Sequence, residues 1–121
     1  MLVNGKQGEL IGIRDRGLLY GDGVFRTLRA TRGHALHWPL HYQKLQHDCA
    51  ALGIPCPDFT LLSNELNDLL PQHPDGVVKL IVTRGQGTRG YIPSTRVEPT
   101  RIWDIAPMPD FPADWAIRGI K

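Results

Sequence analysis

Features that would point to several common classes of protein are scarce or missing in this sequence. The 121 residues include only two cysteines, Cys49 and Cys56, which do not form a Cys-x-x-Cys motif. Two such residues indicate reduced cysteines that pack as small apolar side chains, and they do not indicate a fold held together by disulfides. No apolar run approaches the roughly 18 residues that cross a bilayer, and the first residues lack the apolar stretch of a secretory signal. We therefore expect a cytoplasmic protein with no membrane partner.

A strong charge of either sign is also missing. The 14 basic and 12 acidic residues give a formal net charge of +2, and the basic ones are spread along the chain. Binding to a phosphate backbone requires a cluster or stripe of lysine and arginine, so nucleic acid is not an expected partner. The length and the 41% hydrophobic content suit one ordinary domain, which is small for a complete cofactor-dependent enzyme.

Short apolar or alternating runs predict strands in the first and last thirds of the chain. The early runs read as a hairpin or two edge strands, followed by a second hairpin. The run 77–82 is the strongest strand, because it is β-branched and nearly all apolar, as a central strand covered on both faces would be. The predicted strands cover residues 2–6, 10–13, 24–30, 35–38, 77–82 and 101–106.

Between these strands the apolar period becomes helical. One helix is predicted from Pro39 to Gly53, and a second from Asp58 or Thr60 to Pro71. The order of strands, two helices and strands predicts an α+β fold, in which a largely antiparallel sheet carries two helices packed on one side.

Proline marks a boundary near the end of the chain. Pro107, Pro109 and Pro112 lie within six residues, which is typical of a linker. We therefore expect an N-terminal α+β domain over residues 1–107, with 108–121 forming an interdomain linker and the start of a C-terminal domain.

Two glycine-punctuated segments carry charged and aromatic side chains where plain turns would be expected. The first reads RDRGLLYGDGVF at residues 14–25, and the second reads TRGQGTRGY at residues 83–91. In the second, Arg89 offers a planar fork suited to a carboxylate and Tyr91 offers a hydroxyl. Loops at strand ends are where small-ligand sites concentrate, although a surface loop with a solvated arginine has the same composition.

These segments, with HYQKL at residues 41–45 and KLIVTRG at 79–85, resemble the N-terminal domain of fold-type IV pyridoxal-phosphate enzymes. That family includes aminodeoxychorismate lyases, branched-chain aminotransferases and D-amino-acid aminotransferases. The pairing of YGDGVF with TRGxGxRGY is most similar to the lyases, which eliminate pyruvate from 4-amino-4-deoxychorismate to leave 4-aminobenzoate for folate synthesis. The resemblance implies pyridoxal 5′-phosphate as the cofactor, a small-molecule substrate and a homodimer.

The resemblance also implies roles for particular residues. Lys44 stands where the family usually has an arginine that binds the cofactor phosphate, and Arg26 where a glutamate is common. Phe25, Arg89 and Tyr91 correspond to positions on the substrate side of the pocket. The lysine that forms the Schiff base with the cofactor is expected beyond Lys121, so no catalytic residue is assigned to this chain and the chain alone is expected to be inactive.

Alternatives from other classes stay open. The whole protein could be a branched-chain or D-amino-acid aminotransferase, or the chain could be a non-catalytic binding or dimerisation module. His37 and His41 are four residues apart, with His47 and Cys49 nearby, but Pro39 intervenes and the pair need not share a helix face. We therefore expect no metal site.

Overall fold

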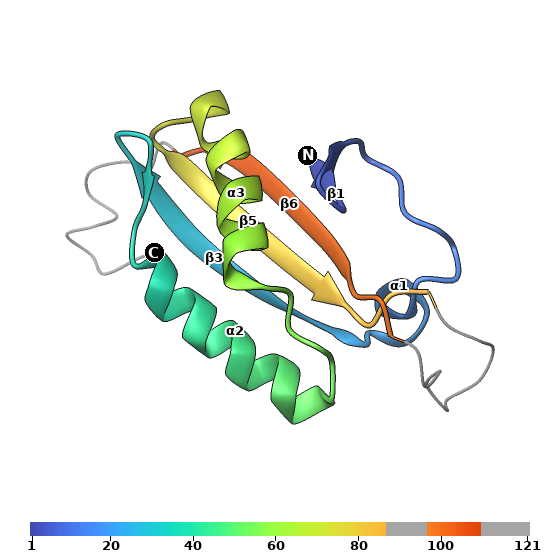
Figure 1. The fold of residues 1–121 in the computed structure, drawn as a ribbon. Coiled ribbons are helices and arrows are strands. Elements are labelled where there is room, and N and C mark those ends of the chain that lie inside the picture. The colour runs from blue at the N-terminus through green and yellow to red at the C-terminus, as the bar shows by residue number, and fades with distance from the viewer. Residues whose placement is uncertain (87–96, 110–121) are drawn as a thin grey trace, which may run out of the picture.

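A computed structural model describes residues 1–86 and 97–109 of the chain. Its centre is a six-stranded sheet in the order β2-β1-β6-β5-β3-β4, in which every neighbouring pair is antiparallel (Figure 1). The predicted antiparallel α+β fold is therefore confirmed. The strands are β1 (Leu2–Val3), β2 (Lys6–Gln7), β3 (Gly23–Thr31), β4 (His34–Ala35), β5 (Gly76–Thr83) and β6 (Thr100–Pro107).

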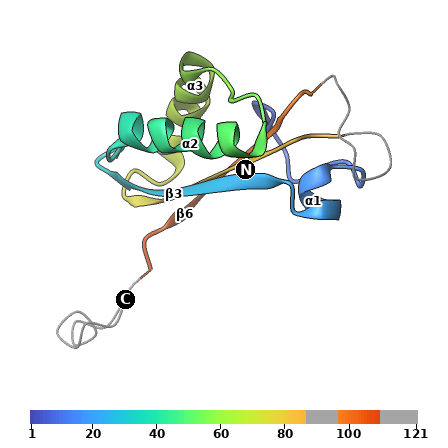
Figure 2. The ribbon, with the colours of Figure 1, turned by 90° about the horizontal axis from the view of Figure 1, so that it is seen from below.

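Two helices, α2 (Trp38–Leu52) and α3 (Phe59–Leu69), cover one face of this sheet. Figure 2 shows both of them on the same side of β3 and β6. Because side chains alternate along a strand, every second residue of β3, β5 and β6 points at these helices. The core they form contains fully buried side chains from both helices and from the sheet, including Leu45, Leu62, Val78, Leu80, Val82 and Trp103.

The ends of both helices follow the capping signals in the sequence. Pro39 lies in the first turn of α2, and Gly53 ends that helix in the left-handed conformation with φ of 70°. Asp58 caps α3 by accepting hydrogen bonds from the backbone nitrogens of Thr60 and Leu61. A 3₁₀ turn, η1 (Leu70–Gln72), follows where Pro71 prevents the α-helix from continuing.

A buried carboxylate joins α3 to β6. Glu65 accepts hydrogen bonds from Nε and Nη2 of Arg101, the shorter at 2.7 Å, and from Nε1 of Trp103 at 3.1 Å. A buried carboxylate is tolerated when its oxygens are paired in this way. The contact fixes α3 on the sheet.

Two predictions about the strands were wrong. The first hairpin turns at Asn4 and Gly5, and residues 10–13 form no strand. Leu10 and Ile13 are 87% and 79% exposed, so their apolar character does not reflect burial among the described residues. In addition, β5 is covered on one face only in the described chain, because Lys79 on its other face is exposed.

A short helix, α1 (Arg16–Tyr20), was not predicted. Asp15 caps it, and Gly21 ends it with φ of 64°. No helix in the part of the chain described here combines the length and apolar character needed to cross a bilayer. Strand β6 ends at Pro107, and most of the predicted linker, residues 110–121, lies outside the described residues.

Candidate functional site

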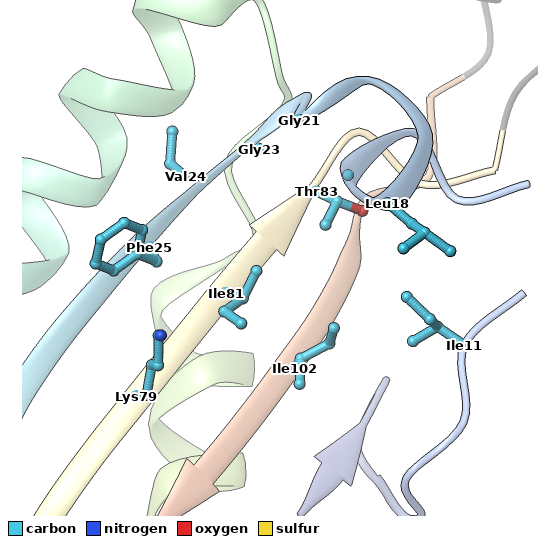
Figure 3. A pocket seen from close by; sticks show the side chains of 11 residues that line it. Ile11, Leu18, Gly21, Gly23, Val24, Phe25, Lys79, Ile81, Thr83 and Ile102 are labelled. Atoms are coloured by element: carbon cyan, nitrogen blue, oxygen red, sulfur yellow. The ribbon is translucent and has the colours of Figure 1, made fainter. Parts of the chain in front are cut away.

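The sheet face opposite α2 and α3 carries an open, mostly apolar cavity of about 330 Å³. Figure 3 shows it between the ends of β3, β5 and β6 and the segment around α1. The apolar side chains on this face are those of Ile11, Leu18, Phe25, Ile81 and Ile102, and Val24 also lines the cavity although its side chain points to the other face of β3. Lys79 provides the one charged side chain among the described residues that line it. An apolar cavity with very few polar groups is typical of a small-molecule site.

Phe25 and Lys79 lie next to each other on this face. In the β3–β5 register, Phe25 pairs with Ile81 and Thr27 pairs with Lys79, so the two side chains are diagonal neighbours. The Lys79 ammonium is 5.1 Å from the centroid of the Phe25 ring, which is 62% exposed. Phe25 thus lines the cavity, and its role on the substrate side stays a prediction. Lys79 was missed, because a lysine in an apolar strand looks like an ordinary solvent-facing residue until the register places it beside Phe25.

The two glycine-punctuated segments meet at one end of the cavity through Asp22. Its Oδ2 accepts hydrogen bonds from Nε of Arg84 at 2.6 Å and from Nε of Arg16 at 3.1 Å. Burial raises the pKa of Asp22, but the hydrogen bonds from Arg84 and Arg16 outweigh it and bring the pKa below its ordinary value of 3.8. Asp22 is therefore a carboxylate at neutral pH that holds both arginines.

Arg84 also binds the end of helix α2. Its Nη2 and Nη1 donate to the carbonyl oxygens of Leu52 at 2.5 Å and Gly53 at 3.1 Å, which have no partner within the helix. Its own backbone nitrogen donates to the carbonyl of Asp22 at 3.0 Å. One side chain thus joins α2, the Asp22 turn and the end of β5.

Asp15 and Gly85 bring the segments together a second time. The buried Asp15 carboxylate accepts from the backbone nitrogen of Gly17 at 2.8 Å and from the hydroxyl of Thr100 at 2.6 Å. The Gly85 carbonyl accepts from the Arg16 nitrogen at 2.8 Å. Gly85 has φ of 86°, and a Cβ at this position would lie 2.1 Å from the Glu98 carbonyl oxygen. Only glycine fits this close approach.

Of the other predicted site residues, Lys44 alone lies within the part of the chain that the structure describes. Lys44 is exposed on α2, next to His41, and is not among the residues that line the cavity. Arg89 and Tyr91 lie outside the described residues. The last residue before that gap, Gln86, forms an isolated bridge with Asp15 at the end of the cavity.

His41 lies near two basic side chains, Arg26 and Lys44. Nη2 of Arg26 is 3.0 Å from its Nδ1. Burial, and then the charges of Arg26, Lys44 and His37, lower the pKa of His41 below its ordinary value of 6.5. His37 precedes α2 in the left-handed conformation with φ of 58°, so it does not continue the helix on which His41 lies.

Comparison with known proteins assigns the family. The model of the amino-transferase class IV family matches residues 23–120, and the chain belongs to that family. An aminodeoxychorismate lyase of Vibrio harveyi is 32% identical over 120 residues, which cover 98% of this chain and 44% of the relative. A D-alanine aminotransferase of Bacillus licheniformis is 32% identical over 98 residues, 75% of this chain and 35% of the relative.

A solved structure agrees with this assignment. The 4-amino-4-deoxychorismate lyase of Pseudomonas aeruginosa superposes with a TM-score of 0.88 at 39% identity, covering 97% of this chain and 43% of that one. The family resemblance inferred from the motifs and the expected N-terminal fold are thus confirmed. The chain spans less than half the length of the lyases it matches.

Proposed function

We propose that this chain is the N-terminal part of a 4-amino-4-deoxychorismate lyase that uses pyridoxal 5′-phosphate, eliminates pyruvate and leaves 4-aminobenzoate. The similarity to two lyases over nearly the whole chain supports it. The observation that carries the proposal is the open sheet face, where a single ammonium group, Lys79, lies beside Phe25 in an apolar cavity. This combination suits a flat ring that bears a carboxylate.

Each side chain on this face has a definite task in that reaction. The Phe25 ring packs against the apolar part of the substrate, while the Lys79 ammonium neutralises and orients a carboxylate. Arg89 and Tyr91, from the adjacent glycine-rich segment, are proposed to bind a carboxylate as well. The apolar wall made by Ile81 and Ile102 excludes water, which strengthens these charge interactions.

The residues near α2 fit the phosphate of the cofactor. Nε of Arg26 is buried without a hydrogen-bond partner, and His41 and Lys44 lie beside that side chain. Lys44 is proposed to supply a positive charge to the phosphate. When bound, the cofactor supplies an electron sink. The lysine that anchors it covalently is proposed to lie in a C-terminal domain beyond Lys121, with the two domains forming a site in a homodimeric enzyme.

An assay of two products tests the proposal. The complete protein, expressed from the reading frame that contains these residues, is given 4-amino-4-deoxychorismate with the cofactor, and pyruvate release is measured. A parallel reaction measures amino transfer from D-alanine to 2-oxoglutarate. We expect pyruvate release to be much the faster reaction. Turnover in neither assay would contradict the proposal and favour a non-catalytic module.

A D-amino-acid aminotransferase is the second candidate, because the D-alanine aminotransferase of Bacillus licheniformis is as similar in sequence identity as the Vibrio lyase. That relative matches a smaller part of this chain, 75% instead of 98%. Amino transfer without pyruvate release would establish this second function in place of the first.

A further inference from the structure

Arg26 is a partly buried arginine whose closest side-chain partner is a histidine. It lies on β3 on the side that faces the helices, between Val24 and Leu28. Its Nη2 is 3.0 Å from Nδ1 of His41, and its Nε is buried with no hydrogen-bond partner. The three ion pairs formed within the described residues use Arg16, Arg84 and Arg101. A guanidinium in this setting has hydrogen-bonding capacity and charge for an anion.

The surroundings of Arg26 provide further donors. Because a guanidinium only donates, Nδ1 of His41 accepts from Arg26, which places the proton of the neutral ring on Nε2. Lys44 follows three residues later, so it lies on the same side of α2 as His41. Arg26, His41 and Lys44 thus present three donors from a strand and a helix, and His37 lies near His41 as well.

A surface cavity lies next to His41 at the edge of the sheet. His41 lines a surface cavity of about 340 Å³ together with Thr27. Thr27 points to the same sheet face as Phe25, whereas His41 belongs to the helix layer. Strand β3 pairs with β4 only at Ala30 and Thr31, so the cavity passes around an edge of β3 that no described strand covers. The cavity therefore reaches from the helix layer at His41 to the sheet face at Thr27, two residues along β3 from Phe25.

We propose that Arg26 supplies the guanidinium that binds the phosphate of the cofactor, with His41 and Lys44 as neighbouring donors. This inference rests on the proposed function. The family resemblance puts an arginine at position 44 and commonly a glutamate at position 26, whereas this chain has Lys44 and Arg26. Both side chains lie near His41 in the structure. A planar guanidinium is therefore still present beside α2, but it belongs to Arg26 on β3 instead of to residue 44 on the helix.

Phosphate and two forms of the cofactor test this assignment on the 121-residue chain. Binding of inorganic phosphate, pyridoxal 5′-phosphate and pyridoxal is measured by calorimetry, and the His41 ring is followed by NMR during pH titrations. We expect phosphate to bind and to raise the pKa of His41, because an anion offsets the neighbouring cations. Arg26→Leu should weaken phosphate and pyridoxal 5′-phosphate about tenfold or more and leave pyridoxal unchanged.

Two variants separate the effect of the planar guanidinium from the effect of its positive charge. Arg26→Lys retains the charge but loses the planar fork, so it should recover only part of the affinity. Lys6→Leu removes a charge from β2, at the opposite edge of the sheet, and should bind both phosphates like the unmodified protein. Circular dichroism establishes that each variant is folded before binding is compared.

Each result separates this inference from the proposed function. Unchanged phosphate affinity in folded Arg26→Leu would overturn the assignment of Arg26 and leave the lyase proposal standing. Phosphate binding that depends on Arg26, with pyridoxal 5′-phosphate bound no more tightly than phosphate, would support the anion site and count against the cofactor. If the unmodified chain binds neither phosphate nor the cofactor, the inference is wrong.

Discussion

Replacement of Arg84 by methionine should destabilise the protein more than most surface substitutions would. The guanidinium is 11% exposed and Asp22 16% exposed, and the two meet at 2.6 Å. Breaking a buried ion pair by removing one partner costs about 3–5 kcal/mol, whereas exposed pairs contribute about 0–1 kcal/mol. Because Arg16 still pairs with Asp22, we expect a value near the lower end, about 2–3 kcal/mol. The carbonyls of Leu52 and Gly53 also lose their donor.

Urea unfolding followed by circular dichroism measures this change. In a chain of this length each kcal/mol corresponds to a Tm shift of about 4 °C, so we expect Tm to fall by about 8–12 °C. Methionine keeps the length of the side chain, which limits the loss of packing. A double-mutant cycle with Asp22→Asn isolates the pair and should give a coupling energy of about 1–2 kcal/mol.

Two results would refute this reasoning. A loss of less than about 0.5 kcal/mol in Arg84→Met would mean that the contact is no stronger than an exposed ion pair. Additive effects of Arg84→Met and Asp22→Asn would mean that the two residues stabilise the fold independently and that Asp22 does not hold the glycine-rich segments together.

Two further predictions concern the same end of the cavity. Gly85→Ala should lower the free energy of unfolding by about 2 kcal/mol or more, because its Cβ would approach the Glu98 carbonyl. Gly21→Ala has φ of 64° but open space around it, so it should lower that free energy clearly less. Equal losses of stability in thermal unfolding would contradict this. The pKa of Asp22 is lowered in the folded protein, so its stabilising effect is complete above 3.8 and lost as the pH falls through the lower folded value. Asp22→Asn should therefore flatten the fall in stability below about pH 4, and an unchanged acid limb in urea unfolding would argue against the lowered pKa.

The helices and the long strands were predictable because their signals are local. Pro39, Gly53 and Asp58 mark helix ends by their own backbone and capping preferences, and the β-branched, nearly all apolar composition of 77–82 marks a strand. The apolar run at 10–13 misled the prediction, because apolar character alone does not say that a strand partner exists. Helix α1 has five residues, too few for a periodic signal, and depends on contacts between Arg16 and the distant Gly85.

The site was only partly predictable for a related reason. The motifs named the two segments that meet at Asp22, but no pattern within either segment says that Arg84 binds Asp22 from 62 residues away. Lys79 became a site residue only through the register of β3 with β5, which places it beside Phe25. Likewise, Arg26 stood out as an unusual residue for the family, but its proximity to His41 depends on how α2 packs against β3.

The claim that the open face forms the substrate wall is tested most directly by Lys79→Met in the pyruvate-release assay of the complete protein, with Lys6→Met on β2 as the matched control. Within residues 1–86 and 97–109, the Phe25 ring is the one side chain with which the Lys79 ammonium interacts, so stability should change little. Loss of one charge-assisted contact corresponds to a rise in KM for 4-amino-4-deoxychorismate of about tenfold or more. Kinetics in Lys79→Met equal to those of Lys6→Met would contradict the account.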